Sequence, residues 1–306
     1  MLIRAIRAFI IVIVLLDVAW LAFKYNASFR VLALVVTGHS RWYSLAEASR
    51  CYEQYRRCHE TARQLAREVR FGEKDPVGFE LWHTPKGKFW MPPGDPTVLP
   101  DLLAEQEARV YGTGDHGIRS GDVVLDCGAH VGVYTRQALL DGARLVIAVE
   151  PAPENLECLR RNLAAEIAAR RVIVCAKGVW DREDSMTLKV KSGNSARDSF
   201  FAIWEGSRPG PKVPLTAIDN LVSELKLERV DFIKMDIEGA EVRAVKGAAS
   251  TLSRYKPRLA IASYHCPNDP NDIPVQIRKA WSGYRMARGP CTEQAGQLYP
   301  EVLYFR

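Results

Sequence analysis

Short apolar runs alternate with segments of helical spacing from about Gly121 onward, and this alternation constrains the fold more than any other feature of the chain. Apolar strands separated by helices are typical of a parallel sheet that is covered on both faces. The expected strands are Val123–Leu125, Leu145–Val149, Val172–Cys175, Val230–Met235 and Arg258–Ser263. The expected helices are Val133–Leu140, Pro153–Ala169 and Ala240–Leu252. We therefore predict an α/β fold with a mostly parallel central sheet.

A glycine-containing turn follows the first expected strand. That strand ends at Asp126 and runs into Cys-Gly-Ala-His-Val-Gly, so Gly128 and Gly132 lie between strand and helix. Glycine permits positive φ and a close approach of a ligand to the backbone. The next strand ends at Glu150, where a carboxylate can accept hydrogen bonds from ribose hydroxyls. The pattern predicts a nucleoside site; alternatively, the glycines serve only tight packing and Glu150 only favours the start of the next helix.

Six stretches of the chain resemble the FkbM-type methyltransferase family, over roughly Phe79 to the C-terminus. They are LAEQEARVYG, GDVVLDCGAHVGVYT, VEPAPENLECLRRN, LTAIDNL, DFIKMDIEGAEVRAVKGA and ASYHCPND. The resemblance implies a Rossmann-like methyltransferase fold and S-adenosyl-L-methionine as the methyl donor. It also implies methylation of an oxygen on a sugar, polyketide or related natural product.

The same resemblance implies a set of cofactor-binding residues. The cofactor turn would hold Asp126, Gly128 and Gly132, and Glu150 would contact the ribose. The segment after the third strand, which contains Ala176, would border the adenine.

Two carboxylates and one histidine are the candidate catalytic groups. Methyl transfer from a sulfonium is an in-line displacement, in which the protein positions donor and acceptor and removes a proton where needed. We expect Asp236 to contact the donor's amino group or the acceptor, and Glu238 to orient an acceptor hydroxyl or to help bind a metal. His265 is the candidate general base, because an unperturbed pKa of about 6.5 suits proton removal. Alternatively, Glu238 and Glu241 only favour the positive end of the following helix and His265 is structural; no metal site is assigned.

An apolar run near the N-terminus predicts contact with a membrane. The run Ala8–Phe23 reads AFIIVIVLLDVAWLAF, with Asp17 as its single charge. As a helix it would measure about 24 Å against a hydrocarbon core of about 30 Å, so a span and an interfacial helix are both open. A signal anchor, a cleaved signal peptide and a buried helix are the competing interpretations. Because S-adenosylmethionine is made in the cytosol, we expect a membrane-associated protein whose catalytic domain faces the cytoplasm.

The stretch between this run and the main domain is expected to hold an amphipathic helix and a small β unit. Ser44–Phe71 has apolar residues at helical spacing, and GFELWHTPKGKFWM alternates around a turn as hairpins do. We therefore expect a membrane-seeking segment at 1–40, a helical arm at 41–76 and a methyltransferase domain at 77–306, with the cofactor-binding core from about 121.

Charge and cysteine content limit the other classes of function. The net charge is +6, but the basic residues are distributed among acidic ones and form no continuous basic stripe. No nucleic-acid partner is therefore indicated. The seven cysteines form no C-x-x-C pair and predict reduced thiols. We expect O-methylation of a hydroxyl on a sugar, glycolipid or other natural-product acceptor. Two alternatives remain open: an NAD-type oxidoreductase, disfavoured by the missing G-x-G-x-x-G, and a catalytically silent binding module tethered to a membrane.

Overall fold

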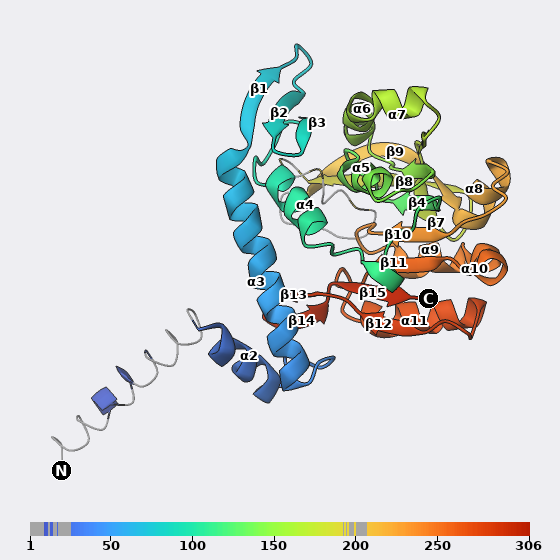
Figure 1. Ribbon diagram of the computed structural model, residues 1–306. Coiled ribbons are helices and arrows are strands. Elements are labelled where there is room, and N and C mark those ends of the chain that lie inside the picture. Colours follow the sequence, from blue (N-terminus) through green and yellow to red (C-terminus); the bar gives the residue numbers. More distant parts are fainter. Residues whose placement is uncertain are drawn as a thin grey trace. The chain divides into compact units, whose positions relative to one another are not determined.

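The computed structural model describes residues 9–11, 13–14, 17, 26–191, 193, 195, 199 and 207–306. The chain forms two compact units. The smaller unit comprises Met1–Arg56 with Pro290–Tyr299, and the larger comprises Arg57–Gly289 with Pro300–Arg306. The larger unit holds the central sheet and the glycine-containing turn (Figure 1).

A seven-stranded sheet forms the centre of the larger unit. Its strands are β4 (Val123–Cys127), β5 (Leu145–Val149), β6 (Val172–Cys175), β10 (Phe232–Met235), β11 (Arg258–Ala262), β12 (Met286–Arg288) and β15 (Val302–Phe305). In space they follow the order β12-β15-β11-β10-β4-β5-β6, and only β15 runs antiparallel to its neighbours. Without β15 this is the 3-2-1-4-5-6 order of dinucleotide-binding sheets. The predicted mostly parallel α/β architecture is confirmed.

The apolar central strands explain why helices cover both faces of this sheet. Successive side chains of a strand point to opposite faces. Leu125 and Ile233 pack into one buried cluster, whereas their neighbours Val124 and Phe232 pack into another. The first cluster is covered by α8 (Ile218–Glu224), α9 (Glu241–Lys246), α10 (Ala249–Tyr255) and α11 (Asp269–Ala280). The second is covered by α5 (Val133–Leu140), α6 (Pro153–Asn162) and α7 (Ala164–Ala168).

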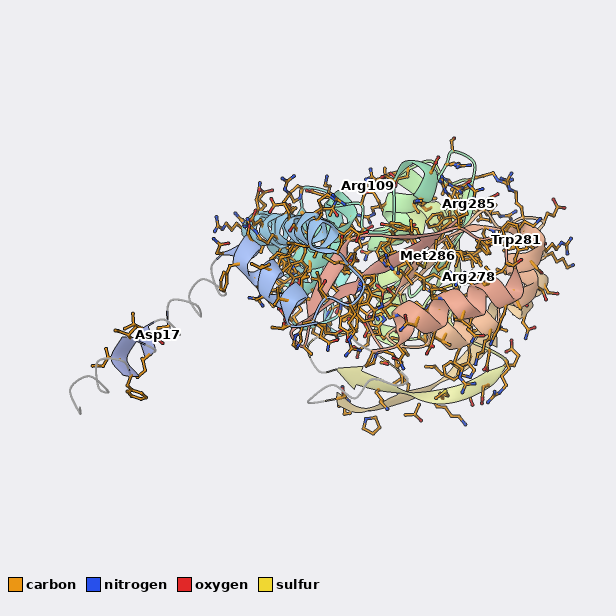
Figure 2. The ribbon with its side chains drawn as sticks, turned by 90° about the horizontal axis from the view of Figure 1, so that it is seen from below. Asp17, Arg109, Arg278, Trp281, Arg285 and Met286 are labelled. Carbon is orange, nitrogen blue, oxygen red and sulfur yellow. A yellow bond between two sulfur atoms is a disulfide. The ribbon has the colours of Figure 1, made fainter. Side chains whose placement is uncertain are left out.

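Two three-stranded sheets complete the larger unit. The first contains β1 (Arg70–Lys74), β2 (Glu80–Thr84) and β3 (Gly87–Met91), with β2 and β3 paired as an antiparallel hairpin. The second contains β7 (Gly178–Trp180), β8 (Asp184–Lys191) and β9 (Ser207–Ala217); β8 and β9 are the yellow strands of Figure 2. α4 (Val98–Glu107) and the short 3₁₀ helix η1 (Gly114–His116) precede the central sheet in the sequence.

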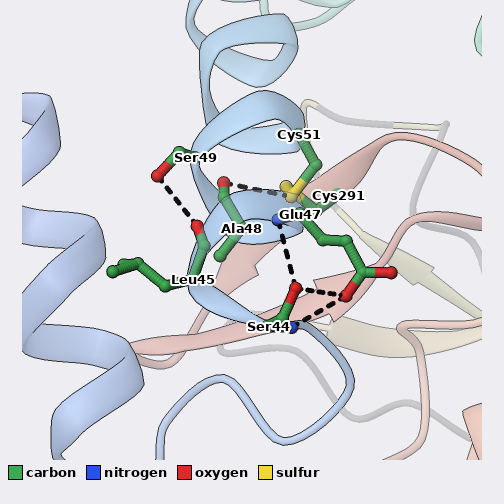
Figure 3. Close-up of a disulfide and its surroundings, with 7 residues drawn as sticks. All are labelled: Ser44, Leu45, Glu47, Ala48, Ser49, Cys51 and Cys291. Carbon is green, nitrogen blue, oxygen red and sulfur yellow. Dashed lines mark hydrogen bonds between the residues drawn. A yellow bond between two sulfur atoms is a disulfide. The ribbon is translucent and has the colours of Figure 1, made fainter.

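The smaller unit contains α2 (Ala27–Val36), the first turns of α3 (Leu45–Glu68), β13 (Cys291–Gln294) and most of β14 (Gln297–Pro300). α3 begins with a capping box, in which the Ser44 amide and hydroxyl both donate to Glu47 Oε2, at 2.9 and 2.7 Å (Figure 3). Two turns on, Cys51 forms a disulfide with Cys291. The prediction that all cysteines are reduced is therefore wrong, because only the other five are free.

The predicted location at a membrane also needs correction. Most of Ala8–Phe23 falls outside the described residues, although Asp17, labelled in Figure 2, is one of the positions that are described. Within the described part of the chain, no helix has both the length and the apolar character that a membrane crossing requires. The predicted localisation, a membrane-associated protein with a catalytic domain facing the cytoplasm, is therefore wrong, and the membrane as a partner has no support.

Candidate functional site

A pocket opens in the larger unit at the carboxyl ends of the central strands, which is the edge where open α/β sheets bind ligands. It contains about 890 Å³ of space not filled by protein atoms, including the part open to solvent. α4 and the segments that follow β4, β5, β6 and β10 surround it. The bordering residues with polar side chains are Glu105, Gln106, Tyr111, His130, Tyr134, Glu150, Asn155, Lys177, Ser195, Lys234, Asp236 and Glu238.

The two glycines of the turn have different surroundings, although both have positive φ, 81° at Gly128 and 89° at Gly132. A Cβ on Gly128 would lie 1.8 Å from the carbonyl oxygen of Asp236, so only glycine lets the two loops approach each other. A Cβ on Gly132 would lie 2.7 Å from Cδ1 of Leu163. Gly128 borders the pocket, whereas Gly132 packs against the helical layer.

Asp126 lies beneath the turn and does not border the pocket. Its side chain is fully buried, accepts a hydrogen bond of 2.6 Å from the Thr135 hydroxyl and lies 3.3 Å from Nζ of Lys234. Lys234 also donates to the Gly128 carbonyl at 2.8 Å. Burial lowers the pKa of Lys234, but the charges of Asp126 and Asp236 outweigh burial and raise the pKa above its usual value. The sequence analysis missed this buried cation, whose signal is a single lysine within an apolar strand.

Glu150 borders the pocket at the carboxyl end of β5. Oε2 accepts a hydrogen bond from the amide of His130 (2.9 Å), and Oε1 accepts from the amide of Ala152 (2.9 Å) and from Asn155 Nδ2 (3.2 Å). Burial raises the pKa of Glu150, while these hydrogen bonds act in the opposite direction. The carboxylate is thus held in one orientation by the turn on one side and the start of α6 on the other.

The adenine segment differs in detail from the expectation. Ala176 is exposed and does not border the pocket. The three residues after it, Lys177, Gly178 and Val179, do border it.

Asp236 follows β10 and lies opposite the glycine turn. The Tyr111 hydroxyl donates to its Oδ2 at 2.6 Å, and its amide donates to the Cys127 carbonyl at 3.1 Å. Burial raises the pKa of Asp236, but the charges of Lys234 and His265 outweigh burial and hold the pKa below its usual value. The pocket therefore contains a carboxylate that stays ionised at neutral pH.

His265 is enclosed by three carboxylates. Its Nδ1 lies 2.8 Å from Glu241 Oε1, and its Nε2 lies 3.4 Å from Asp236 Oδ1 and 3.7 Å from Glu238 Oε1. Burial lowers the pKa of His265, but Glu241, Glu238 and Asp236 outweigh burial and raise the pKa to about 10. Such an imidazole keeps its proton at neutral pH, so the unperturbed pKa that a general-base role assumes is not found.

Glu241 connects this histidine to the loop after β10. It is fully buried; Oε1 accepts a hydrogen bond from the Ile237 amide and Oε2 from the Gly239 amide, both at 3.0 Å. Glu238, within the same loop, has a positive φ of 54°, and its carbonyl accepts a hydrogen bond of 2.7 Å from the Ser199 hydroxyl. The structure thus brings Asp236, Glu238 and His265 together, and adds Glu241, for which the sequence analysis considered only a role at the start of the helix.

Two curated proteins and one solved structure are similar to parts of the chain. A 31-O-demethyl-FK506 methyltransferase of Streptomyces tacrolimicus is 25% identical over 161 residues, which cover 43% of this chain and 62% of that protein. A hexuronic acid methyltransferase of Haloferax volcanii is 24% identical over 159 residues, which cover 52% of this chain and 62% of that protein. The chain thus spans less than two thirds of either relative. A crystal structure of a methyltransferase FkbM from Methylobacillus flagellatus KT covers 82% of this chain and 59% of its own, with 20% identity and a TM-score of 0.48.

A family model provides the assignment. The model of the methyltransferase FkbM domain matches residues 126–286, which make up more than half of the 306-residue chain. The matched range includes the glycine turn, Glu150, the loop after β10 and His265. The chain therefore belongs to the FkbM methyltransferase domain family.

Proposed function

We propose that this chain transfers a methyl group from S-adenosyl-L-methionine to a hydroxyl of a sugar, glycolipid or other natural-product acceptor. Membership of the FkbM family supports the methyl-transfer part. The names of the two curated relatives support the acceptor class, because one refers to an O-demethyl natural product and the other to a hexuronic acid.

The observation that carries the proposal is the fixed carboxylate of Glu150 beside the Gly128 turn. A carboxylate at this strand end suits the two ribose hydroxyls of a nucleoside, and Gly128 lets the loop after β10 approach the turn that borders the same pocket. In this proposal Lys177 to Val179 border the adenine. Asp126 and Gly132 act through the shape of the turn and do not touch the donor.

The carboxylates after β10 suit the reacting end of the donor. The ionised Asp236 can neutralise the positive charge of the donor's sulfonium or amino group, because opposite charges attract more strongly in a largely buried site than in water. Asp236 and Glu238 can orient or deprotonate an acceptor hydroxyl. His265 lies between these two carboxylates and contacts both of them.

Titration calorimetry of the full chain with S-adenosylmethionine and S-adenosylhomocysteine tests the proposal. We expect both ligands to bind, and Glu150→Gln to bind them roughly 10- to 100-fold more weakly, since charge-assisted hydrogen bonds contribute about 1.5–3 kcal/mol. Glu154→Gln, at an exposed position in the first turn of α6, is the matched control and should bind as the wild type does. A folded wild-type chain that binds neither ligand would contradict the proposal.

A further inference from the structure

The imidazole of His265 has one ring nitrogen that makes ionic contacts but no hydrogen bond within the described part of the chain. Its side chain is only 2% exposed. Nδ1 is paired with Glu241, whereas Nε2 has no hydrogen-bond partner among the residues that the structure describes. Asp236 Oδ1, the nearest carboxylate oxygen to Nε2 at 3.4 Å, is likewise buried without a hydrogen-bond partner in the described part of the chain. Two buried polar atoms therefore face each other without forming a hydrogen bond.

The spacing of these atoms matches the coordination shell of a small divalent cation. Around an ion with bonds of about 2.1 Å, neighbouring ligand atoms lie about 3.0–3.5 Å apart, depending on geometry. Nε2 lies 3.4 Å from Asp236 Oδ1 and 3.7 Å from Glu238 Oε1. The distance from Nε2 to each of these two carboxylate oxygens is thus within a few tenths of an ångström of the spacing between neighbouring metal ligands.

Glu241 has the arrangement of an outer carboxylate that orients a metal-binding histidine. Its Oε1 lies 2.8 Å from His265 Nδ1, and both of its oxygens already accept backbone amides. Metal binding would displace the Nε2 proton of His265; in the neutral imidazole that results, Nδ1–H donates to Glu241 and the Nε2 lone pair is free for the metal, a pairing that is common around metal sites. One side of the ring is therefore fixed, and the other is directed at Asp236 and Glu238.

We propose that His265 Nε2, Asp236 and Glu238 form a binding site for one divalent first-row transition-metal ion, with Glu241 as the carboxylate that orients the histidine. One imidazole and two carboxylates favour ions such as Mn²⁺ or Zn²⁺ over Ca²⁺, which prefers a larger shell of oxygens. The local charges also favour a bound cation, because three carboxylates surround a single imidazole in a buried space.

The metal ion would belong to the same site as the proposed methyl transfer. Only the ion's part in the reaction rests on that proposed function. The ion would take an acceptor oxygen as a further ligand and favour its deprotonated form, as bound metal ions do with water. The bound cation would thus let an acceptor approach a pocket lined by acidic side chains. The acceptor would carry a hydroxyl, either alone or next to a carboxylate. The site itself can be tested without any acceptor.

The test is metal binding by the full chain after treatment with chelator. We expect calorimetry to give one Mn²⁺ or Zn²⁺ per chain, with Mg²⁺ and Ca²⁺ at least tenfold weaker. Pulsed electron paramagnetic resonance of the Mn²⁺ complex should show coupling to a directly bound ¹⁴N nucleus, which reports His265 without the need for a variant. A folded chain that binds no transition metal, or a Mn²⁺ complex without nitrogen coupling, would overturn the proposal.

Variants then locate the ion. Asp236→Asn and His265→Gln should weaken Mn²⁺ binding at least 100-fold, and Glu241→Gln by roughly 10- to 100-fold, as outer-carboxylate changes do. His83→Gln, on the exposed side of β2, is the control and should bind as the wild type does. The visible spectrum of the Co²⁺ complex should lose intensity in His265→Gln but shift only slightly in Glu241→Gln, which separates a ligand from a positioning residue. Unchanged affinity in folded Asp236→Asn and His265→Gln would overturn the assignment of the site.

A titration of the metal-free protein with S-adenosylhomocysteine keeps the two proposals apart. Metal binding without donor binding would leave the metal site standing and remove the proposed methyl transfer. Donor binding without metal binding would leave the proposed methyl transfer standing and remove the metal site.

Discussion

Gly128 provides the sharpest test at the scale of a single residue, because one added methyl group would lie 1.8 Å from the Asp236 carbonyl oxygen. Gly128→Ala should lower the free energy of unfolding by about 3 kcal/mol or more, from overlap with backbone in addition to strain at positive φ. Gly121→Ala is the matched control, since Gly121 has a similar φ of 87° but no atom within 4 Å of the added Cβ. That variant should lose only about 1–2 kcal/mol. Urea unfolding measures both, and equal losses would contradict the close approach.

Glu301 gives a prediction for the pH dependence of stability. Burial and the nearby charge of Asp236 raise the pKa of Glu301 to about 8, whereas a glutamate in an unfolded chain has a pKa of about 4.3. The native state thus binds this proton more tightly, so its stabilising effect is complete below about pH 4 and is lost as the pH rises toward 8. The side chain in Glu301→Gln cannot ionise. The free energy of unfolding of this variant should therefore rise by about 1–3 kcal/mol relative to that of the wild type between pH 5 and pH 8. Urea titrations at the two pH values test this, and the same difference at both would refute it.

Individual site residues could be predicted from the sequence only where their position follows from strand order. Glu150 and Asp236 follow β5 and β10, the two strands that flank β4, and parallel strands bring such ends to one edge. The protonated state of His265 could not be predicted, because Glu241 reaches it only through the packing of α9. Lys234 is a similar case, since its partner Asp126 lies on another strand.

At the scale of elements, Asn162 connects the hairpin, α6 and the glycine turn. Its Oδ1 accepts from the Trp90 amide at 2.6 Å, and its Nδ2 donates to the carbonyls of Trp90 and Val131, both at 2.9 Å. Asn162→Ala removes all three hydrogen bonds and should lower the free energy of unfolding by about 2–3 kcal/mol. Asn271→Ala, at an exposed position in α11, should change it by less than about 0.5 kcal/mol. Thermal unfolding compares the two, and a loss in Asn162→Ala no larger than in the control would contradict the role.

The central strands could be predicted almost to the residue, because burial on both faces requires continuous apolar runs. Leu145–Val149 and Val172–Cys175 have the bounds that the sequence predicts. β9 was not predicted, because its sequence SRPGPKVPLTA contains three prolines. β7 pairs with β9 only at Leu215–Ala217, so among the described residues the proline-containing part pairs only with β8, and a missing amide hydrogen is tolerated on its other side. β15 was also not predicted, since nothing local indicates that a last strand inserts antiparallel between two others.

At the scale of the whole molecule, the smaller unit is assembled from two segments far apart in the sequence, Met1–Arg56 and Pro290–Tyr299. Its disulfide joins residues 240 positions apart, so no local motif could have predicted it. Its apolar cluster includes Val31, Tyr52 and Leu298. The predicted division at residues 40 and 76 follows composition along the sequence and stays a prediction, because composition cannot show which distant segments pack together.

The disulfide leads to a prediction about how the chain unfolds. A cross-link over so long a loop restricts the unfolded chain, and its removal commonly costs about 2–5 kcal/mol. We expect Cys51→Ala with Cys291→Ala to lower the free energy of unfolding by that amount, with Cys58→Ala, a free cysteine of the larger unit, as the control. Alkylation in denaturant should label five cysteines before reduction and all seven after it.

Because every residue that borders the pocket belongs to the larger unit, donor binding should persist in the double variant under native conditions. Labelling of all seven cysteines without reductant would show that the bond does not form, and loss of donor binding in a folded double variant would show that the pocket depends on the smaller unit.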